Sequence, residues 1–271
     1  MNGAVRHVGH VVNKWYGREI LMTYRMGEMT WPEFAARKDK PVIVPIGSTE
    51  QHSQHLPMCV DALLAERLAT DLAEAVDGTV MPTIVYGYKS KPLSGGGPLF
   101  PGTIDMNGAT VVAQMHDVLR EIIDDGFTRI VVMNAHFENE AFIVEAIDLV
   151  TRETDGKATI IETNWWDPLP QGVVDQVFDG LTFPGWALEH AAVTETSLML
   201  HYAPELVHMD RMTYRDVVEP KPYVRYPVRD GDVPAYGGLA DPSGSSAERG
   251  RLIAESCVTA VADICRHEFG I

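Results

Sequence analysis

Residues 42–61 read VIVPIGSTEQHSQHLPMCVD, and this stretch decides the fold that we expect for the chain. Its apolar run, Val42 to Ile46, is typical of a parallel strand, because a strand covered on both faces loses the alternation with polar residues. The run ends at the turn residues Gly47 and Ser48. Side chains that can bind a ligand then crowd into twelve positions: Glu50, Gln51, His52, Gln54, His55 and Asp61. A strand that ends and directly presents carboxylates and imidazoles is where open α/β sheets place their ligand sites.

The same arrangement recurs farther along the chain. An apolar strand predicted at 129–133, RIVVM, runs directly into NAHFEN at 134–139. His136 and Glu138 are two residues apart, and the same spacing separates the carboxylate and the imidazole of the first stretch, Glu50-x-His. In an extended segment, side chains at this spacing point the same way and can share one target. A polar surface loop with helix-capping residues is the alternative, and the repetition after a second buried strand favours a ligand site.

Strand and helix patterns alternate along the rest of the chain. Apolar residues at helical spacing predict helices around 64–76, 111–122, 143–150 and 253–264, and one that opens at 183–190 and runs to about residue 201. Further buried strands are predicted at 80–86 and 158–162. This alternation is typical of a mainly parallel sheet between helices, so we expect a three-layer α/β fold.

Residues 1–271 show no solenoid repeat and no convincing linker, so we expect a single domain. Residues 1–30 have no clean apolar period and form an N-terminal extension. Residues 208–246 are rich in Pro, Gly and charge, and we expect an extended arm or lid there. The connection at 87–108 is also long and rich in Gly and Pro. Its Ser94 with three following glycines suits close approach to a small ligand, and a plain flexible loop is the alternative.

The chain is acidic, with 22 Lys and Arg against 38 Asp and Glu and a net charge of -16. Such a charge repels nucleic acid and anionic membranes, so we expect neither as a partner. The three cysteines, Cys59, Cys257 and Cys265, are too few and too scattered for a disulfide framework or a thiolate zinc site. The sequence shows no secretory h-region and no run of about 20 apolar residues, so we expect a cytoplasmic protein without a membrane span.

Two imidazoles and three carboxylates make up the candidate ligand set: Glu50, His52, Asp61, His136 and Glu138. Mixed nitrogen and oxygen donors suit Zn²⁺, Mn²⁺, Fe²⁺ or Co²⁺ rather than Ca²⁺. A single catalytic zinc uses about three protein ligands, so five ligands predict two metal ions. Asp61, at the expected start of the helix after the first stretch, would bridge them. Two divalent ions would supply hydroxide near neutral pH and polarise a substrate carbonyl.

The sequence resembles the creatininase (creatinine amidohydrolase) family. The motifs that carry the resemblance span about residues 42–200, in the family's order. They are VPIGSTEQH at 44–52 with Asp61, YGYKS at 86–90, SGGG at 94–97, FPGT at 100–103, NAHFEN at 134–139, and Gly185-Trp186 with Glu189-His190. The resemblance implies an α/β fold with a mainly parallel sheet, a homohexamer and a dinuclear site usually described with Zn²⁺ and Mn²⁺.

The resemblance also implies a ligand set for each ion. Glu50, Asp61 and His136 would hold one metal, and His52, Asp61 and Glu138 would hold the other. Glu138 would thereby combine a ligand role with a place among the catalytic residues.

Further roles implied by the resemblance concern the substrate. Ser94 and Trp186 would line the pocket, and Trp166 would close it. His190 would pass a proton to the leaving nitrogen, a role that imidazole fills well because it titrates near neutral pH. Seen alone, a His at this position is more typical of helix capping or of the surface.

Two residues depart from the creatininase pattern. Phe137 stands where creatininases proper have Tyr, and Ala187 stands where they have Asp, and both positions are thought to contact the creatinine ring. Losing a hydroxyl and a carboxylate from such a pocket should weaken recognition of that substrate.

We therefore expect a metal-dependent hydrolase acting on a small molecule. It would open a small polar ring, creatinine or a related cyclic amide, by attack of metal-bound hydroxide on a carbonyl. Hydrolysis of an oxidised cyclitol such as a keto-inositol, or of a formamide, is the alternative. A metal-binding scaffold without activity is a third possibility, and full metal occupancy without turnover would favour it.

Overall fold

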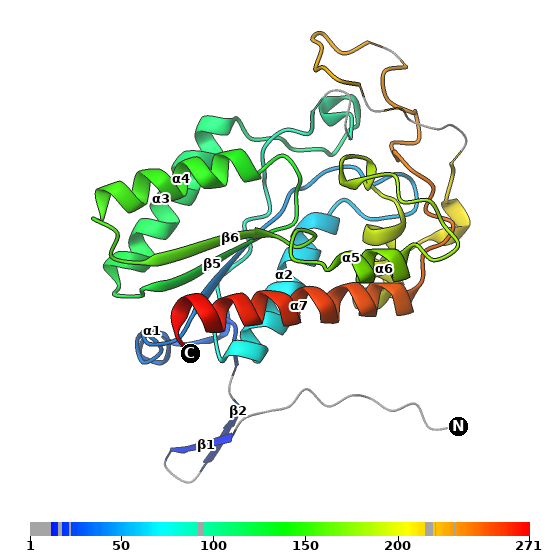
Figure 1. The fold of residues 1–271 in the computed structure, drawn as a ribbon. Coiled ribbons are helices and arrows are strands. Elements are labelled where there is room, and N and C mark those ends of the chain that lie inside the picture. The colour runs from blue at the N-terminus through cyan, green and yellow to red at the C-terminus, as the bar shows by residue number, and fades with distance from the viewer. Residues whose placement is uncertain are drawn as a thin grey trace, which may run out of the picture.

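The structure is a computed structural model that describes residues 12–15, 18–21, 23–91, 95–214, 219, 221–229 and 231–271. Four parallel strands form its central sheet in the order β4-β3-β5-β6 (Figure 1). They are β3 (Val42–Ile46), β4 (Thr79–Val80), β5 (Arg129–Asn134) and β6 (Thr159–Asn164). The strands predicted at the first stretch, at 129–133 and at 158–162 are confirmed, as is the parallel α/β class.

The strand predicted at 80–86 was wrong in length. Only Thr79 and Val80 pair with β3, and a single bridge farther on joins Ile84 to Ile46. Pro82 lies between them and has no N–H to donate to a ladder, so regular pairing stops at that point. The segment nevertheless stays beside β3, because Ile84 N donates to Pro45 O at 3.0 Å.

Helices cover both faces of the sheet (Figure 1). One layer contains α2 (Val60–Val76), α5 (Gln171–Val177), α6 (Val193–Tyr202) and α7 (Ala247–Phe269). The other contains α1 (Trp31–Ala35), α3 (Gly108–Asp124) and α4 (Glu140–Glu153). Within β3, Ile43 packs in the first layer's core, whereas Val42 and Val44 pack in the second. Burial on both faces explains why these strands carry no polar alternation.

The helix predicted to open at 183–190 begins later than expected. A 3-10 turn, η3 (Trp186–Leu188), comes first, and α6 starts only at Val193. Between them Ala191 adopts a left-handed conformation with a φ of 54°, which no regular helix accommodates. His190 therefore lies in the irregular segment between η3 and α6 and not on a helix.

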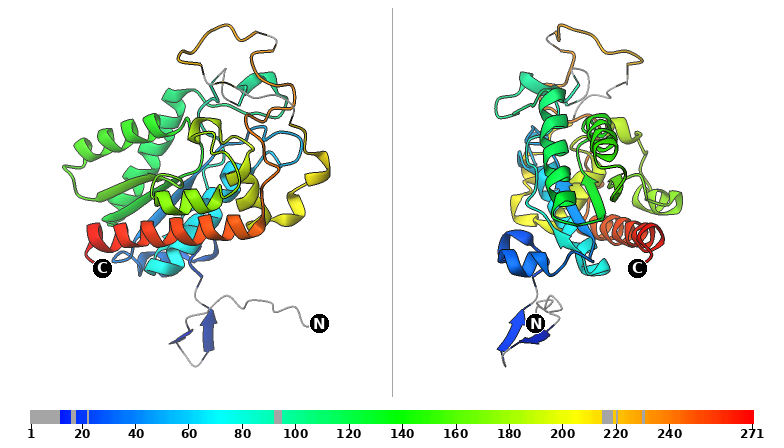
Figure 2. Two further views of the ribbon diagram at one scale, coloured as in Figure 1. Left: turned by 45° about the vertical axis from the view of Figure 1, so that its right-hand side comes forward. Right: turned by 90° about the vertical axis from the view of Figure 1, so that its left-hand side faces the viewer.

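Several smaller elements complete the fold. The remaining 3-10 turns are η1 (Met26–Glu28), η2 (Gly97–Leu99), η4 (Pro204–Leu206) and η5 (Met209–Arg211). The described part of 208–246 contains η5 and otherwise irregular chain, and its role as an arm or lid stays a prediction. An unpredicted antiparallel hairpin, β1 (Val12–Trp15) and β2 (Arg18–Leu21), lies apart from the main body (Figure 2). Among the described residues, no helix has the length and apolar character needed to cross a membrane.

Candidate metal centre

The two ligand-bearing loops leave the sheet at the same edge. β3 and β5 are hydrogen-bonded neighbours with Ile46 opposite Asn134, so the residues that follow each strand emerge side by side. Gly47 makes room for the first turn of α2, because a Cβ at that position would overlap the backbone of Asp61. The strand end and the helix start are thus in direct contact, which brings Asp61 to the loops as the sequence predicted.

Asp61 lies between two imidazoles. Its Oδ1 is 3.0 Å from His52 Nε2, and its Oδ2 is 3.2 Å from His136 Nδ1. The carboxylate is 1% exposed, so water does not screen these contacts. One buried side chain thereby faces two separate nitrogen donors, which is the arrangement expected of a bridging ligand.

Backbone carbonyls orient both imidazoles. His52 Nδ1 lies 3.2 Å from Glu50 O, and His136 Nε2 lies 2.8 Å from Tyr88 O. A carbonyl oxygen only accepts hydrogen bonds, so these two ring nitrogens carry the protons. The opposite nitrogens face the carboxylates and would offer their lone pairs to an ion bound between them, as metal-binding histidines do when their other nitrogen is held by a hydrogen bond.

The structure brings the ligand atoms into two groups that share Asp61. Glu50, Asp61 and His136 form one of them, and His52, Asp61 and Glu195 form the other, with the ligand atoms of each group within 4.8 Å of one another. A third group, Glu50, His52 and His190, meets the same distance limit without Asp61. Glu195 reaches the centre from the first turn of α6, where its Oε2 is 3.6 Å from His52 Nε2. Sequence reasoning missed this residue.

Glu138, the expected third ligand beside His52, lies elsewhere around His136. Its Oε2 is 3.6 Å from His136 Nε2, the nitrogen that is turned toward Tyr88 O. In the described part of the chain it belongs to none of the groups that could hold an ion. Its role as a ligand stays a prediction.

The donors present fit divalent cations. Burial lowers the pKa of His52, but the carboxylates of Asp61 and Glu195 outweigh it and raise that pKa well above its usual value. The surroundings are therefore strongly negative although they are buried. Among the described residues, His52 Nε2 and Asp61 Oδ2 lie within ion-pair distance of a neighbour but make no hydrogen bond of good geometry, and unsatisfied buried polar atoms are costly. Ions with mixed nitrogen and oxygen preference, such as Zn²⁺ and Mn²⁺, would satisfy these atoms.

Neighbouring polar side chains hold the loops in place. Asn139 Nδ2 donates to Gly47 O at 3.0 Å, and Asn139 Oδ1 accepts from Tyr88 N at 2.8 Å, so one amide joins three segments. Asn134 Oδ1 accepts from His136 N. Ser90 Oγ donates to Glu50 Oε2. The two asparagines of NAHFEN therefore support the site and contribute no ligand atom to the groups described.

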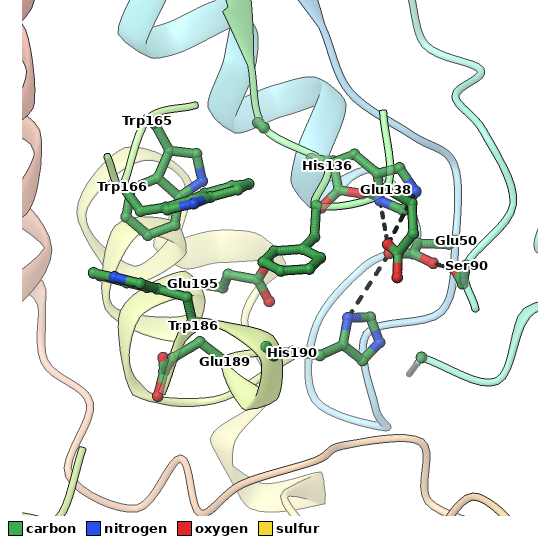
Figure 3. A pocket seen from close by; sticks show the side chains of 15 residues that line it. Glu50, Ser90, His136, Glu138, Trp165, Trp166, Trp186, Glu189, His190 and Glu195 are labelled. Atoms are coloured by element: carbon green, nitrogen blue, oxygen red, sulfur yellow. Dashed lines mark hydrogen bonds and ion pairs between the residues drawn. The ribbon is translucent and has the colours of Figure 1, made fainter. Parts of the chain in front are cut away.

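An aromatic pocket opens beside these side chains. Figure 3 shows Trp166 and Trp186 across the pocket from Glu50, His136 and His190. The Phe137 ring stacks on Trp166, with centroids 5.8 Å apart and planes inclined by 22°. The open space among these side chains has a volume of about 480 Å³, counting the part that is open to solvent.

Comparison with known proteins places the chain. The family model for creatininase, described as creatinine amidohydrolase, matches residues 27–265. The chain belongs to the creatininase family. Creatinine amidohydrolase of Pseudomonas putida is 41% identical over 90% of this chain and 96% of its own. Two solved creatininase structures, a Mn form and a Zn-Zn form of a variant, each match with a TM-score of 0.88, at 40% and 39% identity, over 92% of this chain and 99% of theirs.

Membership in the creatininase family makes the chain a hydrolase with the expected fold, and the relatives together with the ligand groups support divalent metal binding. Of the remaining predicted residues of the substrate site, His190 and Ala187 have defined positions. His190 Nδ1 is 3.8 Å from Glu50 Oε1, and its ring is 4.6 Å from that of His52. Ala187 is exposed and lines the pocket with Trp186. Ser94 lies outside the described residues.

Two contributors in this creatininase-family site were not assigned from the sequence. Glu195 gives only a weak signal, a carboxylate in the buried run AAVTETSLM, where an unpaired charge is costly. Trp165 directly precedes the predicted pocket residue Trp166. It is 2% exposed, lines the pocket and packs edge-on against both Trp166 and Trp186, so it holds the rings of these two tryptophans in place.

Proposed function

We propose that this protein is a dinuclear metal-dependent hydrolase that opens creatinine or a closely related cyclic amide. The observation that carries the proposal is the position of Asp61, whose two oxygens face two different imidazoles inside two ligand groups. The similarity to the Pseudomonas putida creatinine amidohydrolase supports the substrate class. The reaction adds water to the ring carbonyl carbon, breaks the carbon–nitrogen bond and transfers a proton to the nitrogen.

One ion would be held by Glu50, Asp61 and His136, and the other by His52, Asp61 and Glu195. When bound, two such ions lower the pKa of water and polarise a carbonyl. Solved creatininases described as Mn and Zn-Zn forms support these metals, and the mixed donor set suits both.

Two side chains are placed to handle protons. His190 lines the pocket between its aromatic walls and Glu50, where its imidazole can deliver a proton to the leaving nitrogen. Glu138 lies beside His136, with its Oε2 3.6 Å from His136 Nε2, and also lines the pocket. Burial raises the pKa of Glu138, so this carboxyl binds a proton more readily than an exposed glutamate does.

The pocket walls favour a small, flat, polar ring. Trp166 and Trp186 offer aromatic faces on which a planar amide can stack. Phe137 adds a third ring without a hydroxyl, and Ala187 adds a methyl group at the rim without a carboxylate. The walls are therefore less polar than those of creatininases proper, which makes the choice among cyclic amides the open variable of the site.

A turnover screen tests the proposal. The Mn²⁺- and Zn²⁺-loaded protein is assayed with creatinine, other cyclic amides, formamides and keto-inositols. We expect hydrolysis of creatinine or another cyclic amide, abolished by chelation and restored by metal. Turnover confined to formamides or keto-inositols would replace the proposed substrate class, and two bound metals without any turnover would favour a scaffold.

A further inference from the structure

Gln51 occupies a junction between three segments of the site. Its side chain is buried, with the residue 5% exposed. Its Nε2 lies 2.7 Å from Gly95 O, 3.0 Å from Gly237 O and 2.8 Å from His190 Nε2. We propose that Gln51 is a positioning residue that fixes the tautomer and orientation of His190 and couples this ring to Gly237. The inference rests on the proposed role of His190 as the proton donor.

Backbone groups set the orientation of the Gln51 amide independently of His190. Ser53 N–H donates to Gln51 Oε1 at 2.8 Å, so the oxygen is on that side. The other side faces the carbonyl oxygens of Gly95 and Gly237, which only accept hydrogen bonds. Exchanging the amide oxygen and nitrogen would oppose all three contacts at once. The atom that faces His190 is therefore the amide nitrogen.

This orientation decides which ring nitrogen of His190 is protonated. An amide nitrogen cannot accept, so a protonated His190 Nε2 would oppose the Gln51 donor at 2.8 Å, and the proton of the neutral ring therefore lies on Nδ1. Nδ1 in turn faces Glu50 Oε1 at 3.8 Å, which favours a proton on that side. The ring is thus held with its N–H directed toward the ligand cluster, where the pocket is located.

The same amide couples the ring to a distant part of the chain. Gln51 Nε2 carries two hydrogens but lies near three acceptors, of which Gly237 O is the farthest. Leu239 N also donates to His190 O at 3.2 Å. The backbone of Leu239 therefore contacts the backbone of His190, and Gly237 O competes with the His190 ring for the hydrogens of the Gln51 amide. A displacement of Gly237 should change the hydrogen bond that the ring receives.

Two adjacent glycines provide a matched pair for testing this coupling. Gly237 has a φ of 87°, and a Cβ there would overlap Oε1 of Gln51. A Cβ at Gly238 would lie 3.5 Å from the Cβ and Oγ of Ser53, which is ordinary van der Waals contact. Gly237→Ala should therefore displace the Gln51 amide, whereas Gly238→Ala should leave it in place.

The experiment combines a spectroscopic and a kinetic measurement on the full chain. Long-range ¹H–¹⁵N spectra of the metal-loaded protein report the His190 tautomer, with the ring signals assigned by their loss in His190→Ala. We expect the Nδ1–H tautomer in the wild type and in Gly238→Ala. In Gln51→Met, which keeps the side-chain length but removes the donor, and in Gly237→Ala, we expect a mixture of tautomers. Gln51→Met and Gly237→Ala should each lower kcat about 10- to 100-fold, more than they change KM, with metal content retained.

Gln51→Glu supplies the opposite change. A carboxylate in place of the amide would accept from His190 Nε2 and should shift the ring to the Nε2–H tautomer.

The spectra separate failure of this inference from failure of the proposed function, because they require no turnover. An Nε2–H tautomer in the wild type, or a tautomer unchanged in both Gln51→Met and Gly237→Ala, would overturn the positioning role whatever the substrate is. The expected tautomers in a protein that hydrolyses no cyclic amide would uphold the role of Gln51 and reject the substrate class. Should one variant fail to fold, the other still decides the result.

Discussion

Asp61 is the negatively charged residue between the two imidazoles of the candidate metal centre. Its pKa is held well below the usual range. Burial alone would raise this pKa, but the imidazoles of His52 and His136 together lower it by more than burial raises it. The side chain is therefore a carboxylate, and its two oxygens are directed to different partners. No other described residue belongs to both Asp61-centred ligand groups.

The shared position predicts unequal metal losses. Asp61→Asn should remove or loosen both ions, because it halves the negative charge available to each group. Glu195→Gln should deplete chiefly one ion, the one held with His52. Elemental analysis of the purified variants measures both effects. Two ions per chain retained in Asp61→Asn would rule out the bridge, and full occupancy in Glu195→Gln would return the third ligand of the second ion to Glu138.

His190 is predicted to act on turnover and not on metal binding. His190→Ala should keep its metal content and lower kcat by roughly 100- to 10,000-fold, the usual range for a positioned acid–base group. Steady-state kinetics with parallel metal analysis checks this. Activity within about threefold of the wild type would leave His190 with a structural role in the irregular segment before α6.

Phe137 and Ala187 are predicted to set the preference among substrates. The double change Phe137→Tyr with Ala187→Asp adds a hydroxyl and a carboxylate to the pocket wall. It should raise kcat/KM for creatinine by at least about tenfold, or about 1.4 kcal/mol. A wild-type protein that already hydrolyses creatinine efficiently, and that gains nothing from the double change, would show that other residues supply these contacts.

At the scale of elements, the irregular segment between η3 and α6 positions both His190 and Glu195. Glu189 Oε2 accepts from Thr194 N at 2.8 Å, and Ala191 N donates to Glu195 Oε2 at 2.6 Å. These two reciprocal bonds tie the chain before α6 to the first turn of the helix. Burial raises the pKa of Glu189 to about 7, and the nearby charge of Glu195 adds to the shift. Glu195 and the pocket loop are therefore parts of one structural unit.

The strand β6 carries a pH-dependent contribution to stability. Burial raises the pKa of Glu162 from 4.5 to about 7, and the charges of Glu140 and Asp167 add to the shift. The folded chain therefore binds this proton more tightly than the unfolded chain does, so stability falls as pH rises through this interval. Glu162→Gln should leave the free energy of unfolding unchanged near pH 4 and raise it by about 1 kcal/mol at pH 8, after discounting for solvent screening.

Urea unfolding at the two pH values measures this effect. Glu145→Gln, an exposed carboxylate on α4, is the matched control and should change neither value. A gain of equal size at both pH values in Glu162→Gln would show that the substitution acts through packing and not through the proton.

At the scale of the whole molecule, we propose that residues 1–271 form one domain that assembles as a homohexamer. The family relationship motivates the assembly, since symmetric homo-oligomers are common among soluble enzymes. Light scattering at micromolar concentration should report about six times the chain mass. It should be measured at physiological salt, because the net charge of -16 makes chains repel one another when screening is weak. A monomer under these conditions would contradict the proposal.

Much of the fold and part of the centre were predictable because their signals are local. Apolar runs at β3 and β5 predicted buried parallel strands, and neighbouring parallel strands end at one edge. Glu50, His52, His136 and Asp61 follow those strand ends or start the next helix, so the sequence alone indicated that they would meet. The error at 80–86 was also local, since Pro82 interrupts an otherwise strand-like run.

Tertiary structure decided what local pattern could not. Glu195 lies more than 130 residues from Asp61 along the chain, and only the packing of α6 against the first layer's core brings its carboxylate to His52. The contact of Gln51 with Gly237 likewise joins residues 186 positions apart. A residue's own neighbours determine whether it is helical, extended or buried, but the partner of a buried polar atom is set by the arrangement of whole elements. The sequence by itself therefore determined the sheet and the shared edge, and the packed structure decided which distant side chains lie beside that edge.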